Sequence, residues 1–246
     1  MIIGTLTGLL QELQQQIHRN FLAEDALQLI LGGFQNTLVI FFFGAIWALV
    51  LAMFLTYLHI NHKWQWLYRP LHWFVATIHD VPAVVLMMFF YYVVFSASLN
   101  GILVSIIALG VYTSGTLTKI FKIHIKQVGK EQYEAGCMLG FTPKQIYRLI
   151  ILPQAIRNVV PTLLSQIITT IKDSSYLANV ATVELMSRTR QILSSANLYN
   201  GLGSINVSDV FVLYGCAAAI YFIINFSLSV LVRHMNAKKG RVYVGA

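Results

Sequence analysis

An acidic, glycine-punctuated segment lies between two strongly apolar parts of this 246-residue chain. It reads Glu134-Ala135-Gly136-Cys137-Met138-Leu139-Gly140. The carboxylate of Glu134 can make charge-assisted hydrogen bonds to a basic group, and the small residues allow a second helix to come close. Met138 and Leu139 add an apolar contact surface. By spacing alone, a solvated loop that only joins its neighbours is as good an interpretation.

A second set of ionisable residues could contact a solute. Lys172, Asp173 and Ser174 follow an apolar stretch, and Glu184 lies a few turns further on. Charged groups at membrane depth are costly and usually face a bundle interior or a cavity. The set supplies both a cation and an anion, as a zwitterionic solute would need. Alternatively, Lys172 and Asp173 lie at the outer interface and pair with each other or with lipid headgroups.

Other polar residues allow weaker inferences. His79 and Asp80 either line a solute path or belong to a helix-breaking turn before Pro82. His59 and His62 lack nearby Cys or carboxylate support, so no metal site is expected. The sequence contains no G-x-x-x-x-G-K-[ST] phosphate loop, so any ATP would be bound by another subunit and no cofactor is expected. A membrane-embedded enzyme would need a converging set of catalytic residues, which only His79 and Asp80 approach.

The composition is that of an integral membrane protein. Hydrophobic residues make up 57% of the chain and charged residues 11%, against about 25% charged in soluble domains. The net charge of +8 comes from scattered basic residues without a nucleic-acid motif, so nucleic acid is not an expected partner. In a membrane protein a Lys/Arg excess reports topology instead.

We expect an all-α protein that crosses the bilayer five times. Each predicted span is close to the length of about 20 residues that an α-helix needs to cross the hydrocarbon core. The spans cover residues 37–58, 71–95, 101–120, 150–171 and 210–232. Residues 172–208 are too polar for a span and predict a re-entrant or interfacial helix.

The basic residues orient the spans. They concentrate between the first and second spans, between the third and fourth, and at the C-terminal end. The positive-inside rule then places the N-terminus outside and the tail, residues 236–246, in the cytoplasm. The loop over residues 124–150 is also cytoplasmic. Residues 1–30 predict an amphipathic N-terminal segment with leucines on one side.

Within the cytoplasmic loop, local signals predict two short helices. The first would run from Glu131 to Leu139 and end at Gly140, since glycine is favoured just after a helix. Thr142 and Pro143 would begin the second, because proline is tolerated at the first helical position. The result is an exposed elbow.

The loop resembles the EAA signature of ABC-importer permeases. That signature is EAA, three residues, Gly, nine residues and I-x-L-P, and residues 134–153 match it with Gly136 in place of the second alanine. The resemblance extends to the polar amino acid permeases through Pro153-Gln154-Ala155-Ile156-Arg157 and the stretches over residues 172–177 and 183–185. It covers about residues 33–235, the expected permease domain.

Two positions depart from the family pattern. His79-Asp80-Val81-Pro82 stands where family members commonly have an RGTP-like sequence. Lys119 stands where they commonly have an acidic residue. Both positions bear on which solute is carried, so we include His79, Asp80 and Lys119 with Lys172, Asp173, Ser174 and Glu184 in a predicted solute path.

The resemblance implies a type I ABC importer permease in a bacterial inner membrane, most similar to those for polar amino acids. The implied partners are ABC ATPase subunits, a second permease subunit, an extracytoplasmic solute-binding protein and membrane lipid. In the family, the EAA helix docks on the ATPase, which assigns coupling to Glu134, Ala135, Gly136, Met138, Leu139 and Gly140. The alternative is an ATP-independent secondary transporter or channel, which predicts inverted repeats and buried charges in several spans; neither is evident in the sequence.

Overall fold

The structure is a computed structural model that describes residues 24–95, 99–128, 130–180, 182–199 and 207–243. All regular secondary structure in these ranges is helical, which confirms the all-α prediction. Residues 1–23, most of the predicted amphipathic segment, lie outside the described residues. Residues 24–30 belong to the first long helix, and residues 236–243 of the predicted tail continue the last one.

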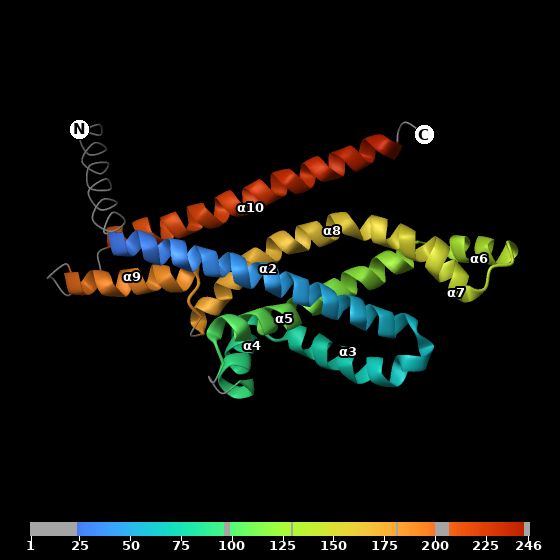
Figure 1. The fold of residues 1–246 in the computed structure, drawn as a ribbon, viewed down its shortest axis with the longest axis horizontal. Coiled ribbons are helices and arrows are strands. Elements are labelled where there is room, and N and C mark those ends of the chain that lie inside the picture. Colours follow the sequence, from blue (N-terminus) through green and yellow to red (C-terminus); the bar gives the residue numbers. More distant parts are fainter. Residues whose placement is uncertain (1–23, 96–98, 129, 181, 200–206, 244–246) are drawn as a thin grey trace.

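Two helices of 37 residues, α2 (Glu24–Ile60) and α10 (Val207–Tyr243), run along the long axis of the molecule (Figure 1). Helix α5 (Gly101–Gln127) packs along α2. Glycine makes this close approach possible, because a Cβ at Gly110 would collide with the Trp47 ring of α2 and lie 3.2 Å from the Gly44 carbonyl oxygen.

Within the described residues, three helices are long and apolar enough to cross a membrane: Ala26–Ile60, Gly101–Gln127 and Val210–His234. A fourth crossing results if the bent pair Gln65–Ile78 and Ala83–Val94 counts as one span. Very little of the apolar stretch of α10 is buried against the rest of the chain.

The predicted span over residues 71–95 is not one straight helix. Helix α3 (Gln65–Asp80), which follows the short turn η1 (His62–Trp64), ends before Pro82. The chain then bends by 115° into α4 (Ala83–Phe89) and the π-helical turn η2 (Phe90–Val94). Proline disfavours helical conformation in the preceding residue, and Val81 is extended with φ −80° and ψ 140°. This geometry matches the helix-breaking interpretation of the sequence around His79 and Asp80.

The predicted fourth span corresponds to α8 (Leu152–Asp173), which follows the π-helical turn η3 (Tyr147–Ile151). At 22 residues α8 is long enough to span, but polar residues such as Gln154, Arg157 and Gln166 keep it out of the set of apolar helices. It packs against α2, α5 and α10, while Gln154 and Arg157 lie exposed on its surface. The described helices therefore give three spans by length and apolarity, or four with the bent pair, and α8 is a further helix of spanning length.

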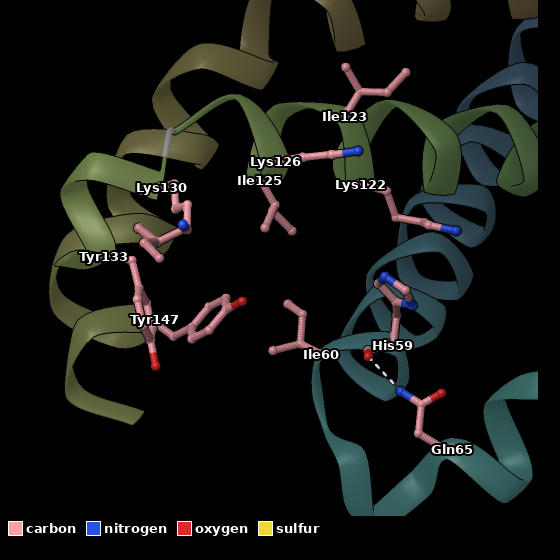
Figure 2. A pocket seen from close by; sticks show the side chains of 11 residues that line it. His59, Ile60, Gln65, Lys122, Ile123, Ile125, Lys126, Lys130, Tyr133 and Tyr147 are labelled. Carbon is pink, nitrogen blue, oxygen red and sulfur yellow. Dashed lines mark hydrogen bonds between the residues drawn. The ribbon is translucent and has the colours of Figure 1, made fainter. Parts of the chain in front are cut away.

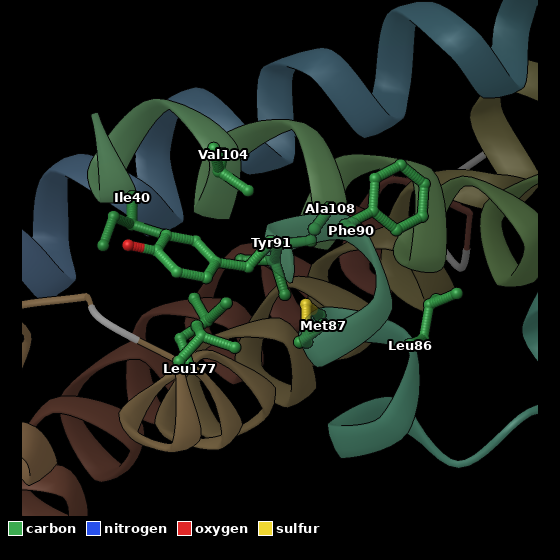
Figure 3. Close-up of a cluster of buried hydrophobic side chains, with 10 residues drawn as sticks. Ile40, Leu86, Met87, Phe90, Tyr91, Val104, Ala108 and Leu177 are labelled. Atoms are coloured by element: carbon green, nitrogen blue, oxygen red, sulfur yellow. The ribbon is translucent and has the colours of Figure 1, made fainter. Parts of the chain in front are cut away.

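A buried apolar cluster joins the bent pair to the rest of the bundle (Figure 3). Met87, Phe90 and Tyr91 pack with Ile40 of α2 and Val104 of α5. Leu177 of the 3₁₀ turn η4 (Ser174–Asn179) closes the cluster from below in this view. The core thus fixes the position of residues 83–94 although their helix is broken.

Shorter helices lie at the two opposite ends of the molecule (Figure 1). Helix α9 (Leu185–Tyr199) packs on the first half of α2 and on α10. Its 15 residues are too few for a span, as the polarity of residues 172–208 predicted. At the other end, α6 (Lys130–Met138) and α7 (Pro143–Ile146) form the elbow between α5 and α8.

Candidate functional site

The first helix of the elbow ends in a Schellman motif, in which two backbone hydrogen bonds close the last turn around a left-handed residue. The Phe141 N–H donates to the Gly136 carbonyl at 3.1 Å, and the Gly140 N–H donates to the Cys137 carbonyl at 3.0 Å. Gly140 has φ +79°, a conformation that glycine adopts without steric cost. The predicted helix over residues 131–139 and its glycine cap are confirmed within one residue.

The second helix begins as the sequence predicts. Thr142 is extended, with ψ 154°, and Pro143 occupies the first helical turn. The Thr142 N–H donates to Gln145 Oε1 at 2.8 Å, which satisfies an amide that the helix itself cannot pair. These local bonds set the angle between α6 and α7.

Close packing holds the two helices of the elbow together. A Cβ added at Gly136 would lie 2.8 Å from Ile146 Cγ1 and 3.1 Å from Ile146 Cδ1. Ile146 is fully buried and belongs to a cluster with Val128, Ile151 and Ala155. The position where the resemblance expects alanine therefore carries glycine here for a physical reason, because the adjacent isoleucine fills the space.

The remaining residues of the predicted coupling set face outward. Met138 is 90% exposed and Leu139 is 73% exposed, and Ala135 and Gly140 are also exposed. The Glu134 side chain is 58% exposed, and its Oε1 lies 3.2 Å from Lys130 Nζ. Exposed ion pairs of this kind contribute at most about 1 kcal/mol, so a stronger partner could replace Lys130. The elbow thus presents a carboxylate beside an apolar tip.

Of the predicted solute-path residues, Glu184 has the best-defined surroundings. It is fully buried, and its carboxylate accepts hydrogen bonds from the backbone N–H groups of Met186 at 2.9 Å and Ser187 at 2.6 Å. The Tyr221 hydroxyl of α10 donates a third, at 3.1 Å. Burial raises the pKa of the Glu184 carboxyl, while these hydrogen bonds oppose the shift. In this geometry Glu184 caps α9 and connects it to α10.

Three hydroxyl groups complete a polar network around Glu184. The Tyr221 hydroxyl also interacts with the side chains of Thr37 and Ser174. Thr37 accepts a hydrogen bond from the Leu185 N–H at 3.1 Å. The structure thus brings Ser174 and Glu184 together, as members of one predicted set, and adds Thr37 and Tyr221. Sequence reasoning missed these two, and the available signal was a polar side chain within an apolar stretch.

The other predicted path residues are dispersed. Lys172 is exposed and Asp173 is half-buried at the end of α8. Asp80 is exposed at the end of α3, and Lys119 is exposed on α5. The backbone of His79 lies in the last turn of α3. A role of these residues in a solute path stays a prediction.

An apolar cavity of about 320 Å³ lies between α2, α5, α8 and α10. Its polar lining residues are Thr113, Gln166 and Thr170, and the buried Thr113 hydroxyl has no hydrogen-bond partner within the described residues. A buried unpaired hydroxyl is costly and can accept a ligand or a water molecule. The sequence analysis did not single out this cavity, because it forms only where four helices meet.

Two substitutions at Glu184 distinguish the effect on stability of its hydrogen-bond acceptors from the effect of its negative charge. Glu184→Ala leaves two backbone N–H groups and one hydroxyl without their acceptor, at about 1–3 kcal/mol for each buried group left unpaired. Glu184→Gln keeps one acceptor oxygen and should fall between Ala and the wild type. We expect thermal unfolding in detergent to show Tm lowered by about 5–10 °C for Ala. Glu131→Ala, at an exposed glutamate, is the control, and an equal loss there would contradict the capping role.

Comparison with known proteins places these features in context. Residues 40–241 match the family described as binding-protein-dependent transport system inner membrane component. The chain is 29% identical over 225 residues to the probable glutamine ABC transporter permease protein GlnM of Bacillus subtilis, covering 89% of this chain and 97% of that protein. It is 29% identical over 219 residues to the L-cystine transport system permease protein TcyB of the same organism, covering 87% of each.

Solved structures support the fold. The crystal structure of an amino acid ABC transporter with histidines superposes with a TM-score of 0.72 at 21% identity, covering 86% of this chain and 94% of that one. An inward-facing structure of the MetNI methionine ABC transporter gives a TM-score of 0.62 at 19% identity, covering 86% and 98%.

Proposed function

Because the chain belongs to the family of binding-protein-dependent transport system inner membrane components, and is a permease subunit of an ATP-driven importer, we propose that its solute is a polar amino acid. The relatives named for glutamine and L-cystine transport support this solute class. The apolar cavity between α2, α5, α8 and α10 offers a passage with a few polar groups, of the kind that small solutes use.

The exposed elbow formed by α6 and α7 is the proposed docking element for a separate ABC ATPase. The observation that carries this assignment is the tip of the elbow, where the side chains of Met138 and Leu139 are largely exposed to solvent beside Glu134. Apolar side chains this exposed mark a contact surface for another protein. Glu134 would bind a basic group of the ATPase, and Gly136 would keep α6 and α7 rigidly joined.

The complete importer would contain a second permease subunit, two ATPase subunits and an extracytoplasmic solute-binding protein. ATP is bound by the ATPase, and the elbow lies on the cytoplasmic side with the N-terminus outside. Closure of the ATPase dimer on ATP would favour one conformation of the bundle over the other through differential contacts with the elbow. The catalytic step thus belongs to the partner and the solute path to this chain.

Reconstitution tests the proposed function. The chain is incorporated into proteoliposomes with its ATPase, and uptake of labelled glutamine and cystine is measured with the solute-binding protein outside and ATP on the ATPase side. We expect uptake only when ATP and the ATPase are both present. Uptake by the permease alone, driven by a solute or ion gradient, would identify an ATP-independent transporter instead.

A further inference from the structure

A basic pocket of about 830 Å³ opens where the end of α2 meets the end of α5 and the elbow (Figure 2). Three lysines, Lys122, Lys126 and Lys130, line it, and its described lining residues include no carboxylate. Tyr133 and Tyr147 bound the opposite side, and Figure 2 shows the Tyr147 hydroxyl directed into the central space. The pocket is therefore positively charged and contains hydroxyl donors.

The positive charge of this pocket is largely uncompensated within the chain. Lys126 has no hydrogen-bond or ion-pair partner in the part of the chain that the structure describes. Lys122 Nζ donates to the Tyr68 hydroxyl at 3.1 Å and lies 3.4 Å from His72 Nε2, and neither partner is an anion. Among the described residues, the ion pair of Lys130 is with the exposed Glu134. Clustered lysines in a partly enclosed space attract an anionic group.

The surroundings of the pocket indicate that the anion is part of an amphiphile. Trp64, in the turn between α2 and α3, and Trp66, in the first turn of α3, are exposed, with Trp66 at 70%. Exposed tryptophans at the end of an apolar helix are typical of the membrane interface, at headgroup depth. Ile60, Ile123 and Ile125 line the pocket, and the Ile123 side chain is exposed. Acyl chains thus have apolar surface beside the lysines.

We propose that this pocket binds the phosphate headgroup of an anionic phospholipid, with Lys122 and Lys126 as its main cationic contacts. The phosphodiester would lie between the two ammonium groups, and the tyrosine hydroxyls would donate further hydrogen bonds. The acyl chains would leave along the apolar side of α5. Basic pockets between helices at the membrane surface bind such headgroups. The pocket would lie at the depth of the lipid headgroups, where the bilayer itself supplies the ligand.

Native mass spectrometry of the purified chain in detergent tests the proposal. Phosphatidylglycerol and phosphatidylcholine are added separately, and the fraction of protein carrying one lipid is measured. We expect a retained phosphatidylglycerol adduct and little phosphatidylcholine adduct. Lys126→Gln should weaken phosphatidylglycerol binding about fivefold, and Lys122→Gln with Lys126→Gln about thirtyfold. Lys63→Gln, an exposed lysine outside the pocket, is the matched control and should change nothing.

Several results would overturn the proposal. Equal binding of the two lipids, or unchanged binding in the double variant, would show that the lysines do not select an anion. Displacement of phosphatidylglycerol by millimolar glycerol phosphate or inorganic phosphate would identify a soluble anion as the ligand. Circular dichroism and size-exclusion elution must match the wild type. If the double variant does not fold, Lys126→Gln alone decides, since the exposed Lys126 makes no hydrogen bond or ion pair within the described residues that would be lost.

Discussion

Glu134→Lys is expected to abolish ATP-driven solute uptake while leaving the chain inserted in the membrane. Removing one member of a hydrogen-bonded charge pair at a protein interface costs about 2–5 kcal/mol, and reversing its charge adds repulsion. Uptake into proteoliposomes should therefore fall at least about thirtyfold. The fold should survive, since the exposed pair with Lys130 contributes at most about 1 kcal/mol.

Glu131→Lys is the matched control for this experiment. Glu131 is also an exposed glutamate of α6, one turn earlier, so the substitution makes the same change in charge on the same helix. We expect it to retain most uptake. If both variants lose uptake equally, net charge near the elbow would explain the result. If Glu134→Lys transports with a normal ATP requirement, the coupling role of Glu134 is wrong.

Gly136→Leu is expected to reduce ATP-driven uptake about tenfold by separating the two helices of the elbow. Its Cβ alone would lie 2.8 Å from Ile146 Cγ1, and Ile146 is fully buried. Overpacking of this kind costs about 1–3 kcal/mol. The same proteoliposome assay measures the uptake. In the absence of solute, the rate of ATP hydrolysis by the ATPase should also change less when the variant permease is added than when the wild type is added.

Ile146→Ala provides the compensating change. It removes the three Ile146 atoms that crowd position 136, so the double variant nearly conserves the total volume. We expect Ile146→Ala alone to lose uptake through the cavity that it leaves, and the double variant to transport better than either single variant. Strictly additive losses would show that the contact between Gly136 and Ile146 does not maintain the elbow.

Local chemistry made the elbow predictable. Gly140 ends α6 through a left-handed backbone conformation, and Thr142 and Pro143 begin α7. Both effects depend only on residues a few positions away in the sequence. Such signals need no knowledge of the rest of the fold. The outward position of Met138 and Leu139 followed from the same elbow, since both lie at its tip.

Features that depend on distant residues were less accessible. The tight fit of Gly136 depends on Ile146, which becomes its neighbour only when the chain turns back. The network around Glu184 joins residues 147 positions apart in sequence, from Thr37 to Glu184. The sequence pattern also did not give the 115° bend that follows α3, or the exposure of polar residues such as Gln154 and Arg157 on α8.

The sparse internal packing of α10 has a consequence for how the bundle is assembled. In a bilayer, lipid tails solvate an apolar helix as well as protein side chains do. The apolar surface of α10 therefore gives little preference for one rotation or depth of the helix over another. A polar bond is then the feature that distinguishes correct from slipped placement. The hydrogen bond from Tyr221 to Glu184 is such a feature, because it forms at only one height and one azimuth of α10. The hydrogen bond therefore contributes less to the free energy of helix association than to the rotation and depth at which α10 is held in the membrane.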